Sequence, residues 1–461
     1  VIGRAGIGVD NVDIPAASKK GVIVMNTPFG NSVTTAEHAI AMMFAVARQL
    51  PEASVSTHAG KWEKNRFMGV ELFNKTLGVI GAGNIGSIVI DRALGLHMKV
   101  LAFDPFLSEE RAKELGVVKV ELDDLLGRAD FITFHVPLTE KTKNILSRDA
   151  IAKLKKGVRI INCARGGLVD EEALAEALKD GRVAGAAFDV FAVEPATDSP
   201  LFNLPNVVVT PHLGASTTEA QENVALQVAE QMSDYLLTGA VQNALNMPSV
   251  TAEEAAVMGP WIKLAAHLGA FVGQMTDEPI KAINVLYDGV VSEMNLNALN
   301  AAVIAGVMKA TNPDVNMVSA PVMAKERGVQ VSTTRQDKAG VFEGYIKLTC
   351  VTGTRERSIA GTVFSDGKPR FIQIRGINVD AEVGQHMLYT RNKDVPGVIG
   401  ALGMTLGDLG VNIANFTLGR SASGAEAIAI LYLDEAIGDE ALAALESTGK
   451  FLQARRLQFE V

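Results

Sequence analysis

Between residues 76 and 210 the chain alternates short, strongly apolar runs with segments whose apolar spacing is helical. The apolar runs are expected to be strands, at Leu77–Ile80, Lys99–Phe103, Phe131–His135, Arg159–Asn162, Gly185–Asp189 and Val207–Thr210. Strands without a polar face that are joined by helices are typical of a parallel sheet covered on both sides. This pattern predicts the α/β fold class, with a doubly wound parallel sheet in residues 27–210.

Composition limits the kinds of partner that the chain can have. The 461 residues carry a formal net charge of −9, which argues against non-specific binding of nucleic acid. The two cysteines, Cys163 and Cys350, imply no disulfide framework and favour a reducing compartment, so we expect a cytoplasmic protein. Apolar stretches such as residues 301–308 are too short to cross a bilayer, so no membrane partner is expected.

A glycine pattern follows the first of these strands. Gly81 permits a tight turn, Gly83 lets the backbone approach a pyrophosphate, and Gly86 allows the next helix to pack closely on the strand. The amino end of that helix offers unpaired N–H groups to an anion. Taken alone, the pattern could equally be a structural turn. Asp104, at the end of the next strand, favours a dinucleotide with free ribose hydroxyls and repels a 2′-phosphate, which predicts NAD; as an alternative, Asp104 caps the turn before Pro105.

Three further strands end close to residues with acid–base or anion-binding chemistry. His212 follows the strand at 207–210 and can exchange a proton with a substrate hydroxyl. Glu194 can accept a hydrogen bond from the other ring nitrogen, and Arg165 offers a forked donor for a carboxylate. Each could be an ordinary loop residue, but three such loops at one edge of a sheet favour an active site.

Taken together, these motifs resemble the D-isomer-specific 2-hydroxy acid dehydrogenase family. The matching segments cover residues 1 to about 240 and are Gly3–Asn11, Asn26–Asn31, Gly81–Gly86, Asn162–Asp170, Asp189–Pro195 and Pro211–Ser216. The resemblance implies that Arg165, Glu194 and His212 are the catalytic residues and that no metal is used. It also implies that the parallel sheet belongs to a Rossmann-type NAD domain.

The resemblance extends to the binding residues. Beside the three glycines, the implied NAD contacts are Ile7, Asn84, Ile85, Asp104, Val136, Cys163, Ala164, Arg165, Asp189, His212, Leu213, Gly214 and Ala215. The implied substrate contacts are Arg4, Gly6, Gly8, Asn31, Arg165 and His212. The glycines near Arg4 can present backbone N–H groups to a carboxylate.

Domain limits follow from the same resemblance and from changes in amino-acid composition along the chain. Residues 1–26 and 211–242 would form a smaller, flavodoxin-like substrate domain into which the NAD domain is inserted, and its first part would precede Val1. Residues 243–382 would form an α+β intervening domain of the allosteric substrate-binding type, ending in a linker at 375–382. Its basic residues Lys325, Arg327, Arg335 and Lys338 could hold an anion.

Residues 383–461 read as strand, helix, strand, strand, helix, strand, which is the ferredoxin-like order. They resemble an ACT domain, a regulatory module that binds small effectors. Asp394 could cap the helix that begins near Pro396. Asp394 and Asn412 could also bind an amino-acid effector such as serine.

The resemblance implies NAD-dependent oxidation of 3-phosphoglycerate to 3-phosphohydroxypyruvate, the first step of L-serine biosynthesis, by a homodimer or homotetramer. The helix expected from Ser32 to Leu50, begun by a capping box at Thr34–Glu37, would be a pairing surface. One alternative is another family member, such as a glyoxylate or hydroxypyruvate reductase, but the two additional carboxyl-terminal domains disfavour it. The other is a non-catalytic NAD-sensing regulator, which the complete Arg165, Glu194 and His212 set disfavours.

Overall fold

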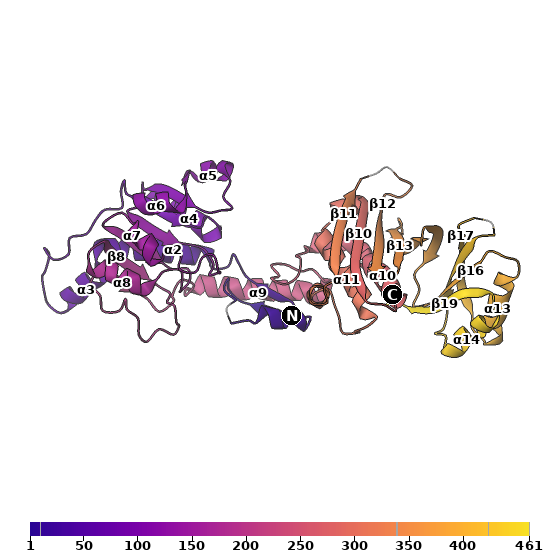
Figure 1. The fold of residues 1–461 in the computed structure, drawn as a ribbon. Coiled ribbons are helices and arrows are strands. Elements are labelled where there is room, and N and C mark those ends of the chain that lie inside the picture. Colours follow the sequence, from indigo (N-terminus) through magenta and orange to yellow (C-terminus); the bar gives the residue numbers. More distant parts are fainter. Residues whose placement is uncertain (10, 338–339, 423, 461) are drawn as a thin grey trace. The chain divides into compact units, whose positions relative to one another are not determined.

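The computed structural model describes residues 1–9, 11–337, 340–422 and 424–460 (Figure 1). The chain divides into two compact units. Unit 1 contains Val1–Arg4, Gly8–Asn26 and Val228–Val461, and unit 2 contains Ala5–Ile7 and Thr27–Gln227. The boundary at residues 227–228 falls inside helix α9 (Thr218–Thr238).

Unit 2 is built on a seven-stranded sheet in which every pair of neighbouring strands is parallel, in the order β5-β4-β3-β6-β7-β8-β9. The strands are β3 (Thr76–Ile80), β4 (Lys99–Phe103), β5 (Val118–Lys119), β6 (Phe131–Phe134), β7 (Val158–Asn162), β8 (Val183–Phe188) and β9 (Val207–Val209). The chain winds outward from β3 in one direction and from β6 in the other, so a crevice opens between their carboxyl ends. The predicted doubly wound sheet is therefore confirmed, and the two-residue strand β5 is an addition to it.

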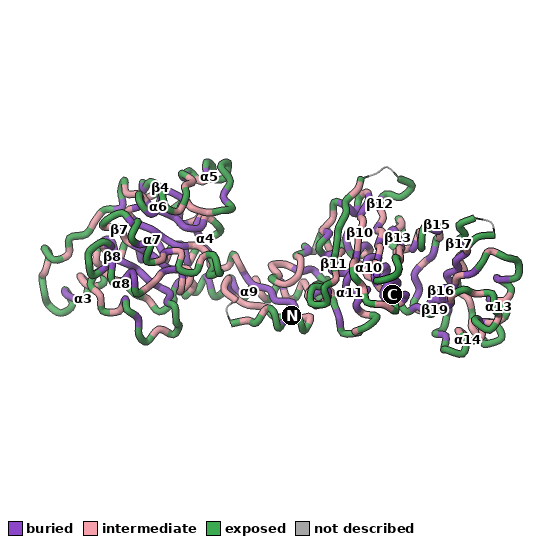
Figure 2. The backbone as a smooth tube through the Cα atoms, in the orientation of Figure 1, coloured by how far each residue is buried: buried purple, intermediate pink, exposed green. Residues whose placement is uncertain are grey.

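Helices cover both faces of this sheet. The helices of unit 2 are α2 (Ser32–Arg48), α3 (Leu50–His58), α4 (Asn84–Gly95), α5 (Glu109–Leu115), α6 (Leu122–Arg128), α7 (Arg148–Ala152) and α8 (Glu171–Lys179). Alternate residues of a strand enter two separate cores: Val79 packs with α2 and α4, whereas Ile80 packs with α6, α7 and α8. Because both faces are buried, the strands carry no polar face, which is why their runs are continuously apolar (Figure 2).

Helix α2 begins differently from the expectation. Asn31 occupies the position before its first residue, and no side chain caps the helix, so the capping box predicted at Thr34–Glu37 is wrong. Those residues lie within the first turns, and the adjacent Thr35 has another role. Its Oγ1 donates to the carbonyl oxygens of Asn31 (3.1 Å) and Gly214 (2.9 Å). Thr35 therefore joins the start of α2 to the loop after β9.

Unit 1 begins with a two-stranded parallel sheet, β1 (Ile2–Arg4) and β2 (Val24–Asn26), and with helix α1 (Ile14–Lys19). The second half of α9 packs on this sheet, because a Cβ on Gly3 would collide with Val228 and Met232.

The larger part of unit 1 holds a six-stranded sheet in the order β11-β10-β12-β13-β14-β15. Its elements are α10 (Ala252–Gln274), β10 (Ile280–Gly289), the 3-10 turn η1 (Val290–Glu293), α11 (Leu296–Lys309), α12 (Ser319–Glu326), β11 (Gln330–Gln336), β12 (Gly344–Thr352), β13 (Glu356–Val363), β14 (Pro369–Ile374) and β15 (Ile377–Glu382). The linker predicted at 375–382 is wrong, because β15 is the edge strand of this sheet. Its apolar residues alternate with exposed polar ones, which is the pattern of a half-buried strand.

Helix α10 is longer than the apolar stretches considered from the sequence, so the statement that they are too short to cross a bilayer does not hold for this helix. Residues Glu253–Gln274 are long and apolar enough to cross a membrane by length and composition alone. The inward residues Leu264 and Leu268 are fully buried in the core shared with α11 and the six-stranded sheet. Gly269 allows α11 to approach closely, because a Cβ there would collide with the carbonyl oxygen of Val303. In this structure α10 is thus the core helix of a packed domain.

The chain ends in an antiparallel four-stranded sheet in the order β17-β18-β16-β19. Its elements are β16 (His386–Lys393), α13 (Val398–Asp408), β17 (Ile413–Arg420), β18 (Glu426–Leu433), α14 (Asp439–Ser447) and β19 (Phe451–Gln458). Both the succession of elements and the sheet order are ferredoxin-like, as predicted. The assignment of this module as an ACT domain remains a prediction.

Candidate active site

The predicted site residues of unit 2 gather where the parallel strands end. Gly81 follows β3, Val136 follows β6 by two residues, and Cys163 follows β7 directly. Asp189 follows β8, and His212 lies three residues beyond β9. In open parallel sheets this edge is where ligands bind.

The loop between β3 and α4 fits a pyrophosphate. Gly81 has φ +96°, and a Cβ there would collide with the carbonyl oxygen of His135. Around Gly83, in contrast, no described atom lies within 4 Å of a Cβ position, so the loop is open on that side. Helix α4 begins at Asn84 without a side-chain cap, and its first N–H groups therefore remain available to an anion. A Cβ on Gly86 would collide with the carbonyl oxygen of Gly81.

Asp104 lies at the end of β4 and supports the same loop. Its Oδ2 accepts a hydrogen bond from the N–H of Ala82 (2.9 Å), and its Oδ1 accepts one from the N–H of Phe106 (2.8 Å). The carboxylate is only half-buried, so it also faces solvent beside the glycine loop. Asp104 therefore acts as a turn acceptor, and its charge lies beside the glycine loop; its contact with the ribose hydroxyls stays a prediction.

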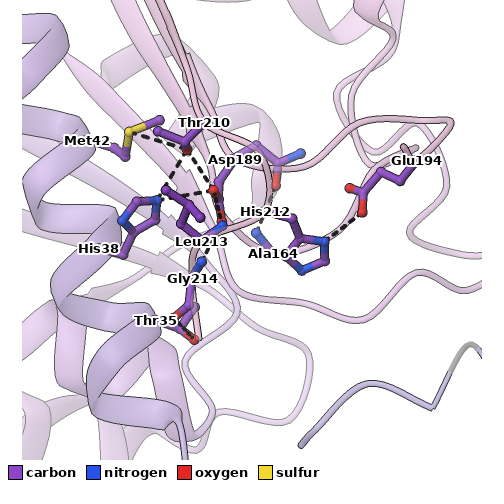
Figure 3. Close-up of polar contacts among 11 residues, drawn as sticks. Thr35, His38, Met42, Ala164, Asp189, Glu194, Thr210, His212, Leu213 and Gly214 are labelled. Atoms are coloured by element: carbon purple, nitrogen blue, oxygen red, sulfur yellow. Dashed lines mark hydrogen bonds and ion pairs between the residues drawn. The ribbon is translucent and has the colours of Figure 1, made fainter. Parts of the chain in front are cut away.

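His212 and Glu194 form a hydrogen-bonded pair. The Nδ1 atom of His212 lies 2.6 Å from Oε2 of Glu194, and Oε1 of Glu194 accepts from the N–H of Phe191 (2.9 Å). The second acceptor contact fixes the carboxylate, which in turn orients the imidazole ring. The His212 side chain is 52% exposed, so its Nε2 edge can reach a substrate. In Figure 3 the ring turns toward Glu194 and away from Asp189.

Asp189 is buried beneath the turn that carries His212. Its Oδ1 accepts from the N–H of Leu213 (2.7 Å) and from Oγ1 of Thr210 (2.6 Å), and its Oδ2 accepts from the N–H of Gly214 (2.8 Å) (Figure 3). His38 Nε2 lies 3.2 Å from Oδ1. Burial alone would raise the pKa of Asp189, but the hydrogen bonds from His38, Thr210 and Leu213 outweigh it and hold the pKa below its usual value.

The sequence prediction treated Asp189 only as a cofactor contact and did not single out His38 or Thr210. In the structure the carboxylate of Asp189 accepts hydrogen bonds from the loop that carries His212. His38 could have been recognised from helical spacing, because Thr35, His38 and Met42 share one face of α2 at intervals of three and four residues. Thr210 lies 3.3 Å from His38 and 3.9 Å from the sulfur of Met42.

Arg165 lies half-buried in the loop after β7. Its Nη1 donates to the carbonyl oxygen of Ala164 (2.7 Å), while Asn162 braces the loop by accepting from the N–H of Ala164 (3.1 Å) and donating to the carbonyl oxygen of Arg165 (2.9 Å). Asn162 was not predicted as a site residue. A Cβ on Gly166 would collide with the carbonyl oxygen of Phe191, so this loop packs directly on the loop that leads to Glu194.

A cavity of about 510 Å³ adjoins the histidine. Phe191, Glu194, Phe202 and His212 line it, together with Pro195, Ala196, Val209, Thr210 and Pro211. Cys163, directly after β7, is buried, and its burial, together with the charge of Asp189, raises the pKa of its thiol. The thiol is therefore neutral and is not a nucleophile at physiological pH.

The remaining predicted residues are placed as follows. The N–H of Gly6 donates to Oγ1 of Thr27 (2.6 Å), and Oδ1 of Asn31 is buried without a hydrogen-bond partner among the described residues. Ile7 belongs to unit 2, whereas Arg4 and Gly8 belong to unit 1. Ile85 and Ala164 are half-buried, as are Val136 and Ala215, while Leu213 is exposed.

Two predictions for the carboxyl-terminal module need comment. Asp394 does not cap α13, because Gly397 precedes that helix and no side chain caps it; Oδ2 of Asp394 instead accepts from Arg420 and from the N–H of Gly424, both at 3.3 Å. Asn412 donates to Asp434 (2.6 Å) and is exposed.

Lys338, one of the basic residues considered for an anion, lies outside the described residues. No cluster of three or more His, Cys, Asp or Glu side chains placed to hold a metal occurs in the described ranges.

Comparisons with known proteins show which families and relatives the chain is similar to. Residues 40–214 match the family "D-isomer specific 2-hydroxyacid dehydrogenase, NAD binding domain", and residues 257–375 match "D-3-phosphoglycerate dehydrogenase intervening domain". The chain is 44% identical to D-3-phosphoglycerate dehydrogenase of Synechocystis sp. over 95% of its own length and 80% of the relative's. For the enzyme of Bacillus subtilis the identity is 43%, covering 95% and 84%. A glyoxylate reductase from Paecilomyes thermophila is similar in structure, with a TM-score of 0.50 and 33% identity over 53% of this chain and 75% of that one.

Proposed function

The chain belongs to the D-isomer specific 2-hydroxyacid dehydrogenase family, among its D-3-phosphoglycerate dehydrogenases, and on this premise we propose that Arg165, Glu194 and His212 are its catalytic residues. The reaction is the NAD-dependent oxidation of the CH–OH group of 3-phosphoglycerate, which yields 3-phosphohydroxypyruvate for L-serine biosynthesis. NAD, when bound, supplies the acceptor for the hydride. The following steps concern what the residues of this chain contribute.

The glycine loop holds the cofactor. The open side of Gly83 and the uncapped first turn of α4 would receive the pyrophosphate, and Asp104 would accept hydrogen bonds from the ribose hydroxyls. The carboxylate at Asp104 also disfavours a 2′-phosphate, which is the physical reason for NAD over NADP. Residues Asn84, Ile85, Val136, Cys163, Ala164 and Leu213–Ala215 complete the proposed cofactor contacts.

His212 is the proposed general base. Glu194 holds Nδ1, so Nε2 is left to accept the proton from the substrate hydroxyl as the hydride leaves the carbon. The charge on Glu194 stabilises the imidazolium that results. Arg165 would bind the substrate carboxylate with its forked guanidinium, and its loop is held in place by Asn162.

Further proposals concern substrate selection and regulation. Arg4, Gly6, Gly8 and Asn31 are proposed to contact the substrate, and the unpartnered Oδ1 of Asn31 supports its part in this. We infer that the four-stranded module is an ACT domain and that Asp394 and Asn412 belong to its effector site, with serine as the effector. A cytoplasmic homo-oligomer, dimeric or tetrameric, fits this function.

The 2.6 Å contact between His212 and Glu194 at the edge of the sheet carries this proposal. The test is NADH formation by the full-length protein with 3-phosphoglycerate, compared with D-glycerate and with NADP in place of NAD. We expect 3-phosphoglycerate with NAD to give the highest kcat/KM. Faster turnover of D-glycerate, which lacks the phosphate, would contradict the assigned substrate; faster turnover with NADP would contradict the role of Asp104.

A further inference from the structure

One face of helix α2 lies against the turn after β9, which carries the proposed general base. This face presents Thr35, His38 and Met42. Oγ1 of Thr35 donates to the carbonyl oxygen of Gly214 (2.9 Å), and Nε2 of His38 lies 3.2 Å from Oδ1 of Asp189 (Figure 3). All of these residues belong to unit 2. The helix therefore contacts the turn and the carboxylate beneath it through polar side chains.

The neighbours of His38 place a proton on its Nε2 atom. Asp189 is ionised at neutral pH, because its hydrogen bonds hold its pKa below the usual value. A carboxylate only accepts hydrogen bonds, so the ring nitrogen beside it must be the donor. The hydroxyl of Thr210 donates its own proton to Oδ1 of Asp189 (2.6 Å) and lies 3.3 Å from Nε2 of His38. The Nε2–H group of His38 is thus shared between Asp189 and Thr210.

The carboxylate of Asp189 depends on donors from more than one element. Its side chain is fully buried, and a buried carboxylate is unfavourable unless hydrogen-bond donors surround it. The backbone N–H groups of Leu213 and Gly214 and the hydroxyl of Thr210 are three of these donors, and all lie at residues 210–214. His38 holds the same carboxylate from α2. It therefore ties the turn to a helix that is itself packed in the core of the unit.

The turn fits closely between the helix and the carboxylate. A Cβ on Gly214 would lie 3.2 Å from Oδ2 of Asp189 and 3.5 Å from Cγ2 of Thr35. The N–H group of Gly214 is bonded to Asp189, and its carbonyl oxygen is bonded to Thr35. A displaced carboxylate would therefore displace the turn as well. A misplacement of about 1 Å at a reacting group can slow a reaction about a hundredfold.

The contact between His38 and Asp189 is not a second proton relay. In Figure 3 the ring of His212 turns away from Asp189. Asp189 meets the turn at the backbone N–H groups of Leu213 and Gly214, which exchange no proton in the reaction. The side chain of His212 is half-exposed and can pass its proton to solvent directly. His38 thus affects where His212 lies, and not how it is protonated.

We propose that His38 is a positioning residue of the reaction. By donating from Nε2 it fixes the carboxylate of Asp189, and through that carboxylate it fixes the turn that places His212 against the substrate. The inference rests on the proposed function of His212 as general base. His38 acts through Asp189 and the backbone of the turn, so it is not a catalytic residue. Helix α2 is thereby part of the scaffold of the active site.

The test compares His38→Leu, which removes the donor, with His38→Gln, whose NH₂ group can replace the Nε2–H group. The matched control is His58→Leu, the same change at an exposed histidine of α3. The kcat of the full-length protein is measured per NADH-binding site, counted by fluorescence titration, so that a loss of folded protein is not taken for a slower reaction. The substrate is 3-phosphoglycerate or, if the wild type oxidises it faster, D-glycerate.

We expect the kcat of His38→Leu to fall about tenfold or more, while KM for the substrate and KM for NAD change by smaller factors. His38→Gln should stay within about threefold of the wild type, because its hydrogen bond to Asp189 is retained, and His58→Leu should equal the wild type.

A kcat within about twofold of the wild type in His38→Leu would overturn the proposal. An equal fall in both His38 variants would also overturn it, because the bulk of the ring and not its hydrogen bond would then decide. A wild type that oxidises D-glycerate faster would contradict the assigned substrate and leave the comparison of the variants intact. A wild type that oxidises neither compound would contradict the proposed function, and this inference with it.

Discussion

Oδ1 of Asp189 accepts a hydrogen bond of 2.7 Å from the backbone N–H of Leu213, the residue directly after the proposed general base His212. His212 itself has φ +58°, a conformation that a histidine rarely adopts. The hydrogen bonds from Leu213, Gly214 and Thr210 to one buried carboxylate hold the turn in this conformation. Asp189 is thus a positioning residue for His212.

An Asp189→Asn variant tests this role. Asparagine has one acceptor oxygen and an NH₂ group that would face a backbone N–H, so one buried donor is left unsatisfied at about 1–3 kcal/mol. We predict a fall in kcat of about tenfold to a hundredfold, since the histidine is displaced but not removed. Steady-state kinetics and thermal unfolding measure the two effects. The exposed Asp149→Asn change is the control, and an unchanged kcat in Asp189→Asn would refute the positioning role.

The Glu194→Gln variant tests the charge of Glu194 in the proposed catalytic pair. The glutamine oxygen can still accept from the N–H of Phe191, but its NH₂ group then faces Nδ1 of His212 and donates to it, which favours a proton on Nε2; the side chain also carries no charge to stabilise the imidazolium. We predict that kcat falls about a hundredfold while KM for NAD stays within about twofold. The exposed Glu172→Gln protein should behave as the wild type. Equal losses in kcat and in cofactor affinity would mean that Glu194 supports the fold of the site instead.

Cofactor choice should depend on the charge of Asp104. In Asp104→Asn the side-chain oxygen can still accept from Ala82, but the repulsion of a 2′-phosphate is removed. We predict that the ratio of kcat/KM for NADP to that for NAD rises about tenfold or more. Asp91→Asn, on the surface of α4, is the control for a nearby loss of charge. An unchanged ratio would contradict the assigned role.

His135 predicts how the stability of unit 2 depends on pH. Its Nδ1 is buried without a partner among the described residues, and burial lowers the pKa from 6.5 to about 3. Below about pH 6.5 the His135 side chain of the unfolded protein therefore binds a proton, whereas that of the folded protein stays neutral until the pH approaches 3. The contribution of neutral His135 to the free energy of unfolding is therefore complete above pH 6.5. As the pH falls toward 3, the free energy of unfolding decreases by up to about 1.4 kcal/mol per pH unit.

The measurement is chemical unfolding of the wild type and of His135→Gln at pH 7.5 and pH 5. Between pH 7.5 and pH 5 the free energy of unfolding of the wild type should fall by about 2 kcal/mol more than that of the variant. The reason is that pH 5 lies about 1.5 units below the ordinary histidine pKa of about 6.5. Other titrating groups, such as His267, contribute equally to both proteins. Parallel losses in the two proteins would show that His135 does not titrate in this way.

Much of unit 2 could be predicted because each of its strands has both faces buried and its loops carry chemically distinctive residues. The capping box at Thr34–Glu37 failed because α2 begins earlier, at Ser32, so that Thr34 already lies inside the first turn of the helix. The strand β15 was missed because charged residues such as Asp380 make its sequence resemble a loop. In the structure Asp380 lies on the exposed face of the strand. Long-range bonds such as His38 to Asp189 join residues about 150 apart, and a single sequence does not show which of them meet.

The most direct test of the account is NADH formation from 3-phosphoglycerate and NAD by the full-length His212→Gln variant, measured beside the binding of NADH. Glutamine preserves a hydrogen-bonding side chain but cannot take up the substrate proton. We predict a loss of kcat of about a hundredfold to ten-thousandfold with NADH affinity unchanged within about twofold. Turnover close to that of the wild type would contradict the assignment of His212 as general base, and with it the proposed mechanism.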